Sequence, residues 1–122
     1  MQPHRLVRRA SLLAAASPHP LFRVGAVVAH GGRIIATGTN KPRSHPQAPG
    51  PFYTIHAEVD ALTGIQRHRV AGATLYVVRL TRDGTLAGSR PCARCWDVLV
   101  RQGLRRVYYL SATGALCHEP VG

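Results

Sequence analysis

Two stretches, His-Ala-Glu at 56–58 and Pro-Cys-Ala-Arg-Cys at 91–95, decide how this chain is organised. A catalytic zinc ion takes three protein ligands and keeps a fourth position for water. His56, Cys92 and Cys95 offer one imidazole and two thiolates, so the two stretches together predict one zinc site. Glu58 is then left free to move protons.

The spacing of the cysteines indicates a helix. Positions 92 and 95 are i and i+3, which places both sulfurs on one face of a first helical turn, and Pro91 stands where a helix begins. Unpaired backbone N–H groups at a helix start stabilise thiolates. A structural zinc site is the alternative, but such sites usually have four protein ligands, and no further Cys or His stands at ligand spacing.

Length and composition predict one domain over residues 1–122, with a single core. Of the three cysteines, Cys117 has no partner, so we expect a reducing, cytoplasmic setting or a protein without disulfides. The apolar run 12–16 is too short for a signal peptide, and no stretch is long enough to span a membrane. The formal net charge of +11 would attract polyanions. The alternative is that the surface is basic but binds no anionic partner.

Periodicity predicts the elements in order. Apolar residues recur at helical spacing over 3–16, and β-rich runs at 21–29 and 33–39 flank a Gly-Gly turn, which predicts an antiparallel hairpin. A proline-rich loop follows from Asn40 and leads to Phe52 and Tyr53, which either stack on a base or pack the loop onto the core. Thr54 is a candidate N-cap of a helix that ends near His68.

The second half alternates strands with one helix. The near-continuous apolar run 73–80 predicts the central strand, and 81–90 an extended loop before the cysteines. A helix over 92–102, capped by Gly103, leads to a strand at 106–110, which a right-handed crossover makes parallel to the central strand. Residues 115–119 can return only as a short antiparallel edge strand.

The order of elements and the motif His-x-Glu…Pro-Cys-x-x-Cys resemble the cytidine deaminase-like superfamily over nearly the whole chain. The resemblance implies a three-layer α/β/α fold with a mixed sheet of four to five strands, and hydrolytic deamination with Zn²⁺ as cofactor. Gly38-Thr39-Asn40 looks like the family's Gly-x-Asn, so Asn40 would contact the substrate, although it is also a plausible turn residue. The Ala57 amide and the Pro91 carbonyl would meet the reacting edge of the base.

The short chain end and His56, where free-nucleoside members usually carry cysteine, resemble the compact toxin-like and phage-like branches. This resemblance implies a delivered toxin or phage-derived domain as the alternative to a cytoplasmic protein. We therefore expect conversion of cytosine to uracil in a single- or double-stranded polynucleotide, with DNA favoured. Phe52 or Tyr53 would stack on the base. Arginines near the site would contact the phosphates, namely Arg43, Arg82, Arg90 and Arg94.

Two other functions remain open at this point. A deaminase of a free nucleoside, nucleotide or base, of the cytidine, dCMP or adenine type, would share the zinc chemistry. A zinc-stabilised nucleic-acid-binding module would not need Glu58, so the presence of that residue argues against it. The sequence leaves the oligomeric state open.

Overall fold

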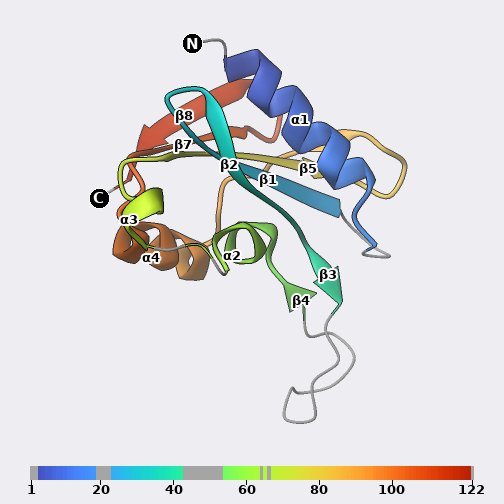
Figure 1. The fold of residues 1–122 in the computed structure, drawn as a ribbon. Helices are drawn as coiled ribbons and strands as arrows, with labels where there is room; N and C mark the ends of the chain where they lie inside the picture. The colour runs from blue at the N-terminus through green and yellow to red at the C-terminus, as the bar shows by residue number, and fades with distance from the viewer. Residues whose placement is uncertain (1–2, 19–22, 43–53, 64, 66, 122) are drawn as a thin grey trace.

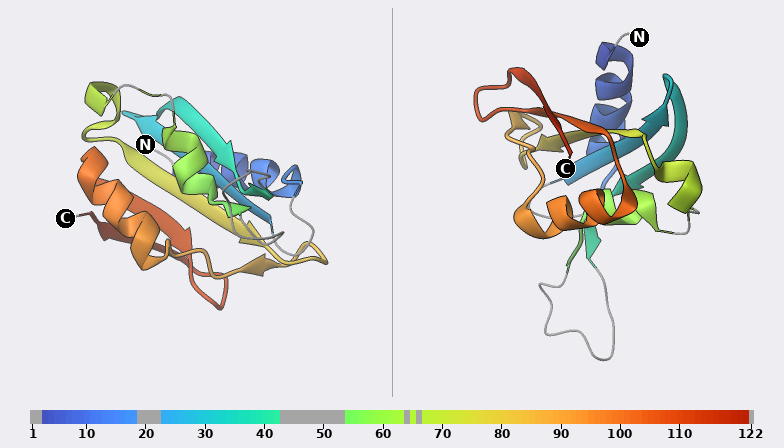
Figure 2. Two further views of the ribbon diagram at one scale, coloured as in Figure 1. Left: turned by 90° about the horizontal axis from the view of Figure 1, so that it is seen from below. Right: turned by 90° about the vertical axis from the view of Figure 1, so that its left-hand side faces the viewer.

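The computed structural model describes residues 3–18, 23–42, 54–63, 65 and 67–121. A mixed β-sheet lies between two helical layers, with α1 (Pro3–Ala15) on one face and α2 (Ala57–Leu62), α3 (Arg67–Val70) and α4 (Ala93–Gln102) on the other (Figure 1). This arrangement confirms the predicted three-layer α/β/α fold class. The two stretches that carry His56 and the cysteines begin α2 and α4, so both lie on the same side of the sheet (Figure 2).

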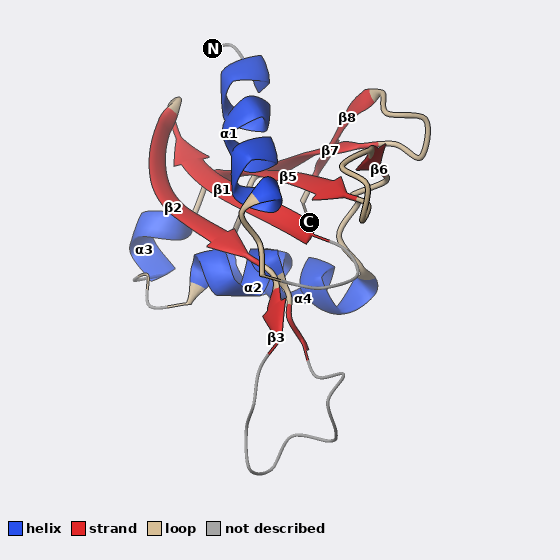
Figure 3. Ribbon diagram, turned by 90° about the vertical axis from the view of Figure 1, so that its right-hand side faces the viewer, coloured by secondary structure: helices blue, strands red, loops and turns tan. Residues whose placement is uncertain are grey.

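Most of the strands match the predicted elements. They are β1 (Arg23–His30), β2 (Arg33–Thr39), β3 (Lys41–Pro42), β4 (Thr54–Ile55), β5 (Thr74–Leu80), β6 (Leu86–Ala87), β7 (Arg106–Leu110) and β8 (Leu116–Pro120). The main sheet runs β2-β1-β5-β7-β8, and β6 adds a short sixth strand that pairs with β5 (Figure 3). The predicted parallel pair β5–β7 and the antiparallel edge strand β8 are confirmed.

The central strand β5 is apolar from Leu75 to Val78 because both of its faces pack against a hydrophobic core. Leu75 and Val77 point into a cluster with residues of α2 and α4, while Tyr76 and Val78 point into a cluster under α1. Alternate strand residues face opposite sides of a sheet, so a strand buried on both faces shows no polar alternation. One face of β5 therefore packs against α2 and α4, which carry the predicted zinc ligands, and the other face packs against α1.

The main differences from the predicted elements lie around the first zinc-binding stretch. Thr54 belongs to β4, which pairs with β3 in a separate two-stranded sheet, and His56 is the N-cap of the helix instead. Helix α2 ends at Leu62, because Thr63 already has extended backbone angles, and α3 follows separately. A β-branched threonine followed in the sequence by glycine is a weak helix former, which explains the early stop. Residues 81–90, expected as loop, also include β6.

Gly38 allows β2 to lie directly against α2. A Cβ atom at this position would stand 2.4 Å from the carbonyl oxygen of Ala57 and 2.4 Å from the backbone nitrogen of Ala61. Only a residue without a side chain permits this approach. The contact fixes the helix that carries His56 and Glu58 against the sheet.

We therefore predict that Gly38→Ala destabilises the protein by about 1–3 kcal/mol, the usual cost of overpacking a rigid contact. The shift of α2 should also lower zinc content, because His56 moves with the helix. Urea unfolding and metal analysis measure the two effects. Gly88→Ala is the matched control, since its added Cβ would meet no described atom closer than 3.4 Å. Equal unfolding midpoints for the two variants would contradict the prediction.

Candidate metal centre and active site

Three potential metal ligands meet between the starts of α2 and α4. His56 is the N-cap of α2, Cys92 is the N-cap of α4, and Cys95 lies in the first turn of α4. The Nδ1 atom of His56 is 3.1 Å from Cys95 Sγ and 3.8 Å from Cys92 Sγ, and one ligand atom from each residue lies within 4.8 Å of the others. The structure thus brings together the three residues that the sequence predicts as zinc ligands.

The local backbone explains why these side chains converge. Helix α4 begins at Ala93, two positions after Pro91, and a hydrogen bond of its first turn runs from Trp96 N to the Cys92 carbonyl oxygen at 2.8 Å. The unpaired backbone N–H groups of this ten-residue helix lie at the same end as the two cysteines, and the helix dipole favours negative charge there. At the other end, Gly103 adopts φ 79° and closes the helix as the predicted C-cap.

The donor set fits zinc by its chemistry. Cys95 is 1% exposed, and burial, reinforced by the nearby charge of Glu58, raises the pKa of its thiol. Two thiolates next to a buried carboxylate are therefore unstable without a compensating cation, and thiolates with an imidazole are ligands that select zinc. His56, Cys92 and Cys95 would hold the ion and leave one position open to water.

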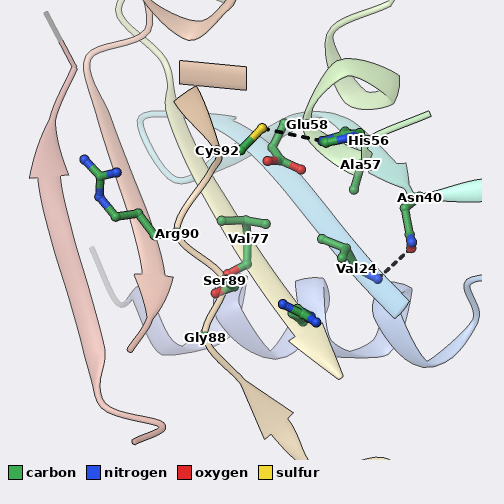
Figure 4. A pocket seen from close by; sticks show the side chains of 11 residues that line it. Val24, Asn40, His56, Ala57, Glu58, Val77, Gly88, Ser89, Arg90 and Cys92 are labelled. Carbon is green, nitrogen blue, oxygen red and sulfur yellow. Dashed lines mark hydrogen bonds between the residues drawn. The ribbon is translucent and has the colours of Figure 1, made fainter. Parts of the chain in front are cut away.

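Glu58 is 6% exposed and lies beside His56 and Cys92 (Figure 4), and its carboxyl group also interacts with Cys95. Burial raises the pKa of its carboxyl above the ordinary value, opposed by a backbone hydrogen bond and by the charge of His56. A carboxyl group with a raised pKa exchanges protons more readily near neutral pH than an ordinary glutamate does. The position and the pKa direction both agree with a role in proton transfer.

A cavity of about 210 Å³ opens beside these groups. It is lined by Val24, Asn40, His56, Ala57, Glu58, Val77, Arg79, Gly88, Ser89, Arg90 and Cys92. Its volume is just below the ~300–1,000 Å³ typical of small-molecule sites. The predicted residues Asn40 and Ala57 line it, and Pro91, which is buried, directly precedes the lining residue Cys92.

Asn40 is held in one orientation by a partner that sequence reasoning missed. Its Oδ1 atom accepts hydrogen bonds from the backbone N–H of Val24 and from the hydroxyl of Ser17, both at 2.7 Å, and its side chain is buried. The Ser17 hydroxyl also lies 2.6 Å from the Asn40 carbonyl oxygen. These contacts tie Asn40 to the segment after α1, so the residue is more than a local turn former.

Ser89 is a second residue that the sequence did not single out. Its hydroxyl donates to the carbonyl of Val77 in β5 at 2.9 Å and accepts from the N–H of Leu110 in β7 at 2.8 Å. The side chain thus bridges the middle of β5 and the end of the parallel strand β7, just before the cysteine stretch. No motif marks this role in the sequence, because it depends on which strands become neighbours.

The arginines predicted to contact phosphates have different surroundings. Arg90 lines the cavity, but its Nε donates to Glu119 at 2.7 Å and its guanidinium lies 4.6 Å above the Trp96 ring. Its side chain points away from Glu58 and Asn40 (Figure 4). Arg94 is exposed on α4 and Arg82 is exposed between β5 and β6. Arg43, Phe52 and Tyr53 lie outside the described residues.

Within the part of the chain that the structure describes, no helix is both long and apolar enough to cross a membrane.

Comparison with known proteins links this geometry to a family. The model of the family "Cytidine and deoxycytidylate deaminase zinc-binding region" matches residues 1–111. The chain is also 37% identical, over 89 residues, to the riboflavin biosynthesis protein RibD of Aquifex aeolicus. That match covers 73% of this chain but 21% of the relative, so the chain corresponds to about a fifth of that longer protein.

Solved structures share the fold. The cytidine deaminase of Burkholderia pseudomallei superposes with a TM-score of 0.73 at 22% identity, covering 100% of this chain and 94% of that one. The dCMP deaminase of cyanophage S-TIM5 superposes with a TM-score of 0.65 at 24% identity, covering 91% and 86%. At these identities the structures support the fold, while the family model also covers the residues of the metal centre. The chain belongs to the zinc-binding cytidine and deoxycytidylate deaminase family.

Proposed function

We propose that this protein is a zinc-dependent hydrolytic deaminase of a free cytosine nucleoside or nucleotide. The observation that carries the proposal is the buried carboxyl of Glu58, which shares one small cavity with the ligand residues His56 and Cys92. A structural zinc site needs no such proton carrier and no cavity beside the metal. The combination is that of a site built for water-dependent chemistry.

The reaction exchanges the exocyclic amine of cytosine for the oxygen of water. Zinc in a three-ligand site supplies the chemistry that makes water nucleophilic at neutral pH. Glu58 accepts a proton as the water oxygen attacks C4, delivers it to the ring nitrogen N3, and passes a second proton to the departing amine. The exocyclic C–N bond breaks, and the products are the corresponding uracil nucleoside or nucleotide and ammonia. The Ala57 amide and Pro91 carbonyl are proposed to hold the reacting edge of the ring.

Two observations favour a free substrate over the polynucleotide expected from the sequence. The related proteins are named for cytidine, deoxycytidylate and riboflavin biosynthesis, and not for nucleic acids. Among the arginines whose side chains the structure describes, Arg79 and Arg90 line the cavity, and Arg90 is already paired with Glu119. The high net charge is therefore weak evidence for a polynucleotide at this site.

The substrate class is tested by incubating the zinc-loaded protein with cytidine, deoxycytidine, CMP, dCMP and a cytosine-containing oligonucleotide at equal cytosine concentration. Ammonia release and chromatography of the products report turnover. We expect a free nucleoside or nucleotide to give the highest kcat/KM. Faster turnover of the oligonucleotide would restore the polynucleotide assignment, and no ammonia from any substrate would refute cytosine deamination.

Asn40 is proposed to present its side-chain amide to the substrate, since its Oδ1 is committed to Ser17 and Val24. We predict that Asn40→Asp raises KM about 10-fold or more, because the carboxylate keeps the acceptor for these bonds but loses the NH₂ donor. Steady-state kinetics give KM, and metal analysis should show unchanged zinc. Asn40→Ala should in addition destabilise the fold by about 1–3 kcal/mol, because the Val24 N–H loses its partner. Wild-type KM in the folded Asn40→Asp variant would remove Asn40 from substrate binding.

A further inference from the structure

The charge of the chain is unevenly distributed along the sequence and across the fold. The first acidic residue in the sequence is Glu58, although arginines occur from position 5 onward. Everything before α2, including α1 and the hairpin β1–β2, therefore contributes basic groups and no carboxylate side chain. Such an asymmetry between two parts of a chain is typical of proteins that bind an anionic partner.

Helix α1 displays a basic outer face. Its Leu6, Ala10 and Ala14 are fully buried against the sheet. The opposite side exposes four basic side chains within two turns, which we call the α1 basic surface: His4, Arg5, Arg8 and Arg9. Arg5 donates to the carbonyl of Gly32 at 2.7 Å, whereas Arg8 and Arg9 form no hydrogen bond or ion pair with any residue that the structure describes.

Further basic and aromatic side chains lie on the same side of the sheet as α1. Tyr76, Tyr108 and His118 are cross-strand neighbours on β5, β7 and β8, with ring centroids 5.0 Å and 5.2 Å apart. Arg106 contacts the His118 ring from the neighbouring strand. Burial raises the pKa of Tyr76, and the Arg5 guanidinium is near enough to oppose that shift. The three rings therefore form a row with Arg5 of α1 near one end and Arg106 of β7 in contact with the other.

The carboxylates lie elsewhere. Glu58 and Asp60 belong to α2, and Asp97 belongs to α4, both on the opposite side of the sheet. Glu119 accepts from Arg90 and Tyr109, which places it on the opposite face from its strand neighbour His118. Asp83 lies in the turn between β5 and β6 and is engaged by Thr81 and Thr85. The positive field on the α1 side is thus largely uncompensated.

From this placement we infer that the α1 basic surface docks the phosphate backbone of a nucleic acid, separately from the catalytic cavity. Exposed guanidinium groups without carboxylate partners are the chemistry that neutralises phosphates irrespective of base sequence. An anionic membrane fits less well. A membrane-surface helix inserts its apolar face, but the apolar face of α1 is buried, and Leu12, 62% exposed, is the one large apolar side chain strongly exposed on the described part of α1.

The sheet separates this surface from the metal centre. Helix α1 covers one face, whereas α2 and α4, with His56, Glu58 and the cysteines, cover the other (Figures 1 and 3). A nucleic acid bound along α1 therefore does not enter the cavity. Binding on α1 is independent of which small molecule the cavity accepts. It would also explain the high positive net charge, which deamination of a small molecule does not require.

The test is fluorescence anisotropy with a labelled DNA duplex of about 20 base pairs, titrated with the zinc-loaded protein at several salt concentrations. The variant Arg8→Gln/Arg9→Gln removes two exposed groups and keeps the helix. Each phosphate contact contributes roughly −0.9 to the slope of log K against log salt concentration. Loss of two contacts should therefore reduce the magnitude of this slope by about 1.8 and weaken binding by roughly 10- to 100-fold at about 0.1 M salt. Deamination of the free substrate should be unchanged by this variant.

Arg82→Gln/Arg94→Gln is the matched control, because it removes the same charge from exposed positions outside the α1 basic surface. It should keep near wild-type affinity. An equal loss in both double variants would mean only unspecific attraction by net charge, and no loss in Arg8→Gln/Arg9→Gln would place the duplex elsewhere. Competitive inhibition of deamination by the duplex would locate it at the cavity, and tighter binding to phosphatidylserine vesicles than to DNA would assign the surface to membranes. Each of these results would overturn the inference.

Discussion

Replacing Glu58 by glutamine should reduce kcat by about 10²–10⁴-fold while zinc content and fold are retained. The change removes the group that accepts and returns protons, and a positioned general acid–base contributes a factor of this size. Glutamine has nearly the same shape, and Glu58 is not among the three clustered ligands, so the metal should stay bound. Ammonia release, metal analysis and circular dichroism measure the three quantities.

Asp97→Asn is the matched control for Glu58→Gln. It also neutralises one carboxylate near the start of a zinc-site helix, but Asp97 is exposed on α4 and does not line the cavity. Its kcat should stay within about two-fold of the wild type, as expected for a surface position. A Glu58→Gln enzyme with near-normal turnover would show that another group carries the protons and would remove Glu58 from the mechanism.

The metal centre was predictable from the sequence because its signal is local. Each half of the site is a short motif at the start of a helix, and i, i+3 spacing in a first turn determines where the cysteine sulfurs point. The central strand and the edge strand β8 were predictable for a related reason. A strand-length run rich in apolar residues is typical of a strand covered on both faces, and the short connection from Leu110 to Leu116 allows only antiparallel pairing.

The walls of the cavity were less predictable because they depend on distant contacts. Ser17 donates to Asn40 across 23 positions of sequence, and Ser89 bridges the middle of β5 and the end of β7. Val24 and Val77 read as ordinary strand residues, and only the register of β1 against β5 places both at the site. The early end of α2 was missed since the apolar spacing continued after the helix had stopped.

The surroundings of Arg90 also depend on a residue distant in the sequence. In the sequence Arg90 stands two positions before the ligand residue Cys92, and this proximity favoured a role in holding phosphates at the site. Glu119 is 29 positions away and becomes its partner only when β8 lies beside β7. This carboxylate also accepts from Tyr109, and the guanidinium together with the tyrosine hydroxyl lowers the pKa of Glu119 to about 2. The pair therefore stays ionised throughout the pH range of ordinary assays.

Replacing Cys95 by alanine should abolish both zinc binding and activity. Cys95 is the most buried of the three ligand residues, and its sulfur is the closer of the two to His56 Nδ1. Two remaining ligands hold zinc poorly, so the metal content should fall from about one ion per chain to less than ~0.1. Activity should fall below detection, because Glu58 alone does not make water nucleophilic.

The stability of this variant separates a lost ligand from a damaged core. Metal that binds only the folded state adds about 4 kcal/mol when its concentration is 1,000-fold above Kd. Addition of a chelator should therefore lower the melting temperature of the wild type and of Cys117→Ala, the matched cysteine control outside the cluster, but leave that of Cys95→Ala unchanged. One zinc ion per chain in Cys95→Ala, or an equal response of all three proteins to the chelator, would refute the ligand assignment. Loss of zinc in Cys117→Ala would instead indicate that metal binding depends on general stability, because Cys117 lies on β8 and its thiol donates to the Ala115 carbonyl, not to a residue of the metal centre.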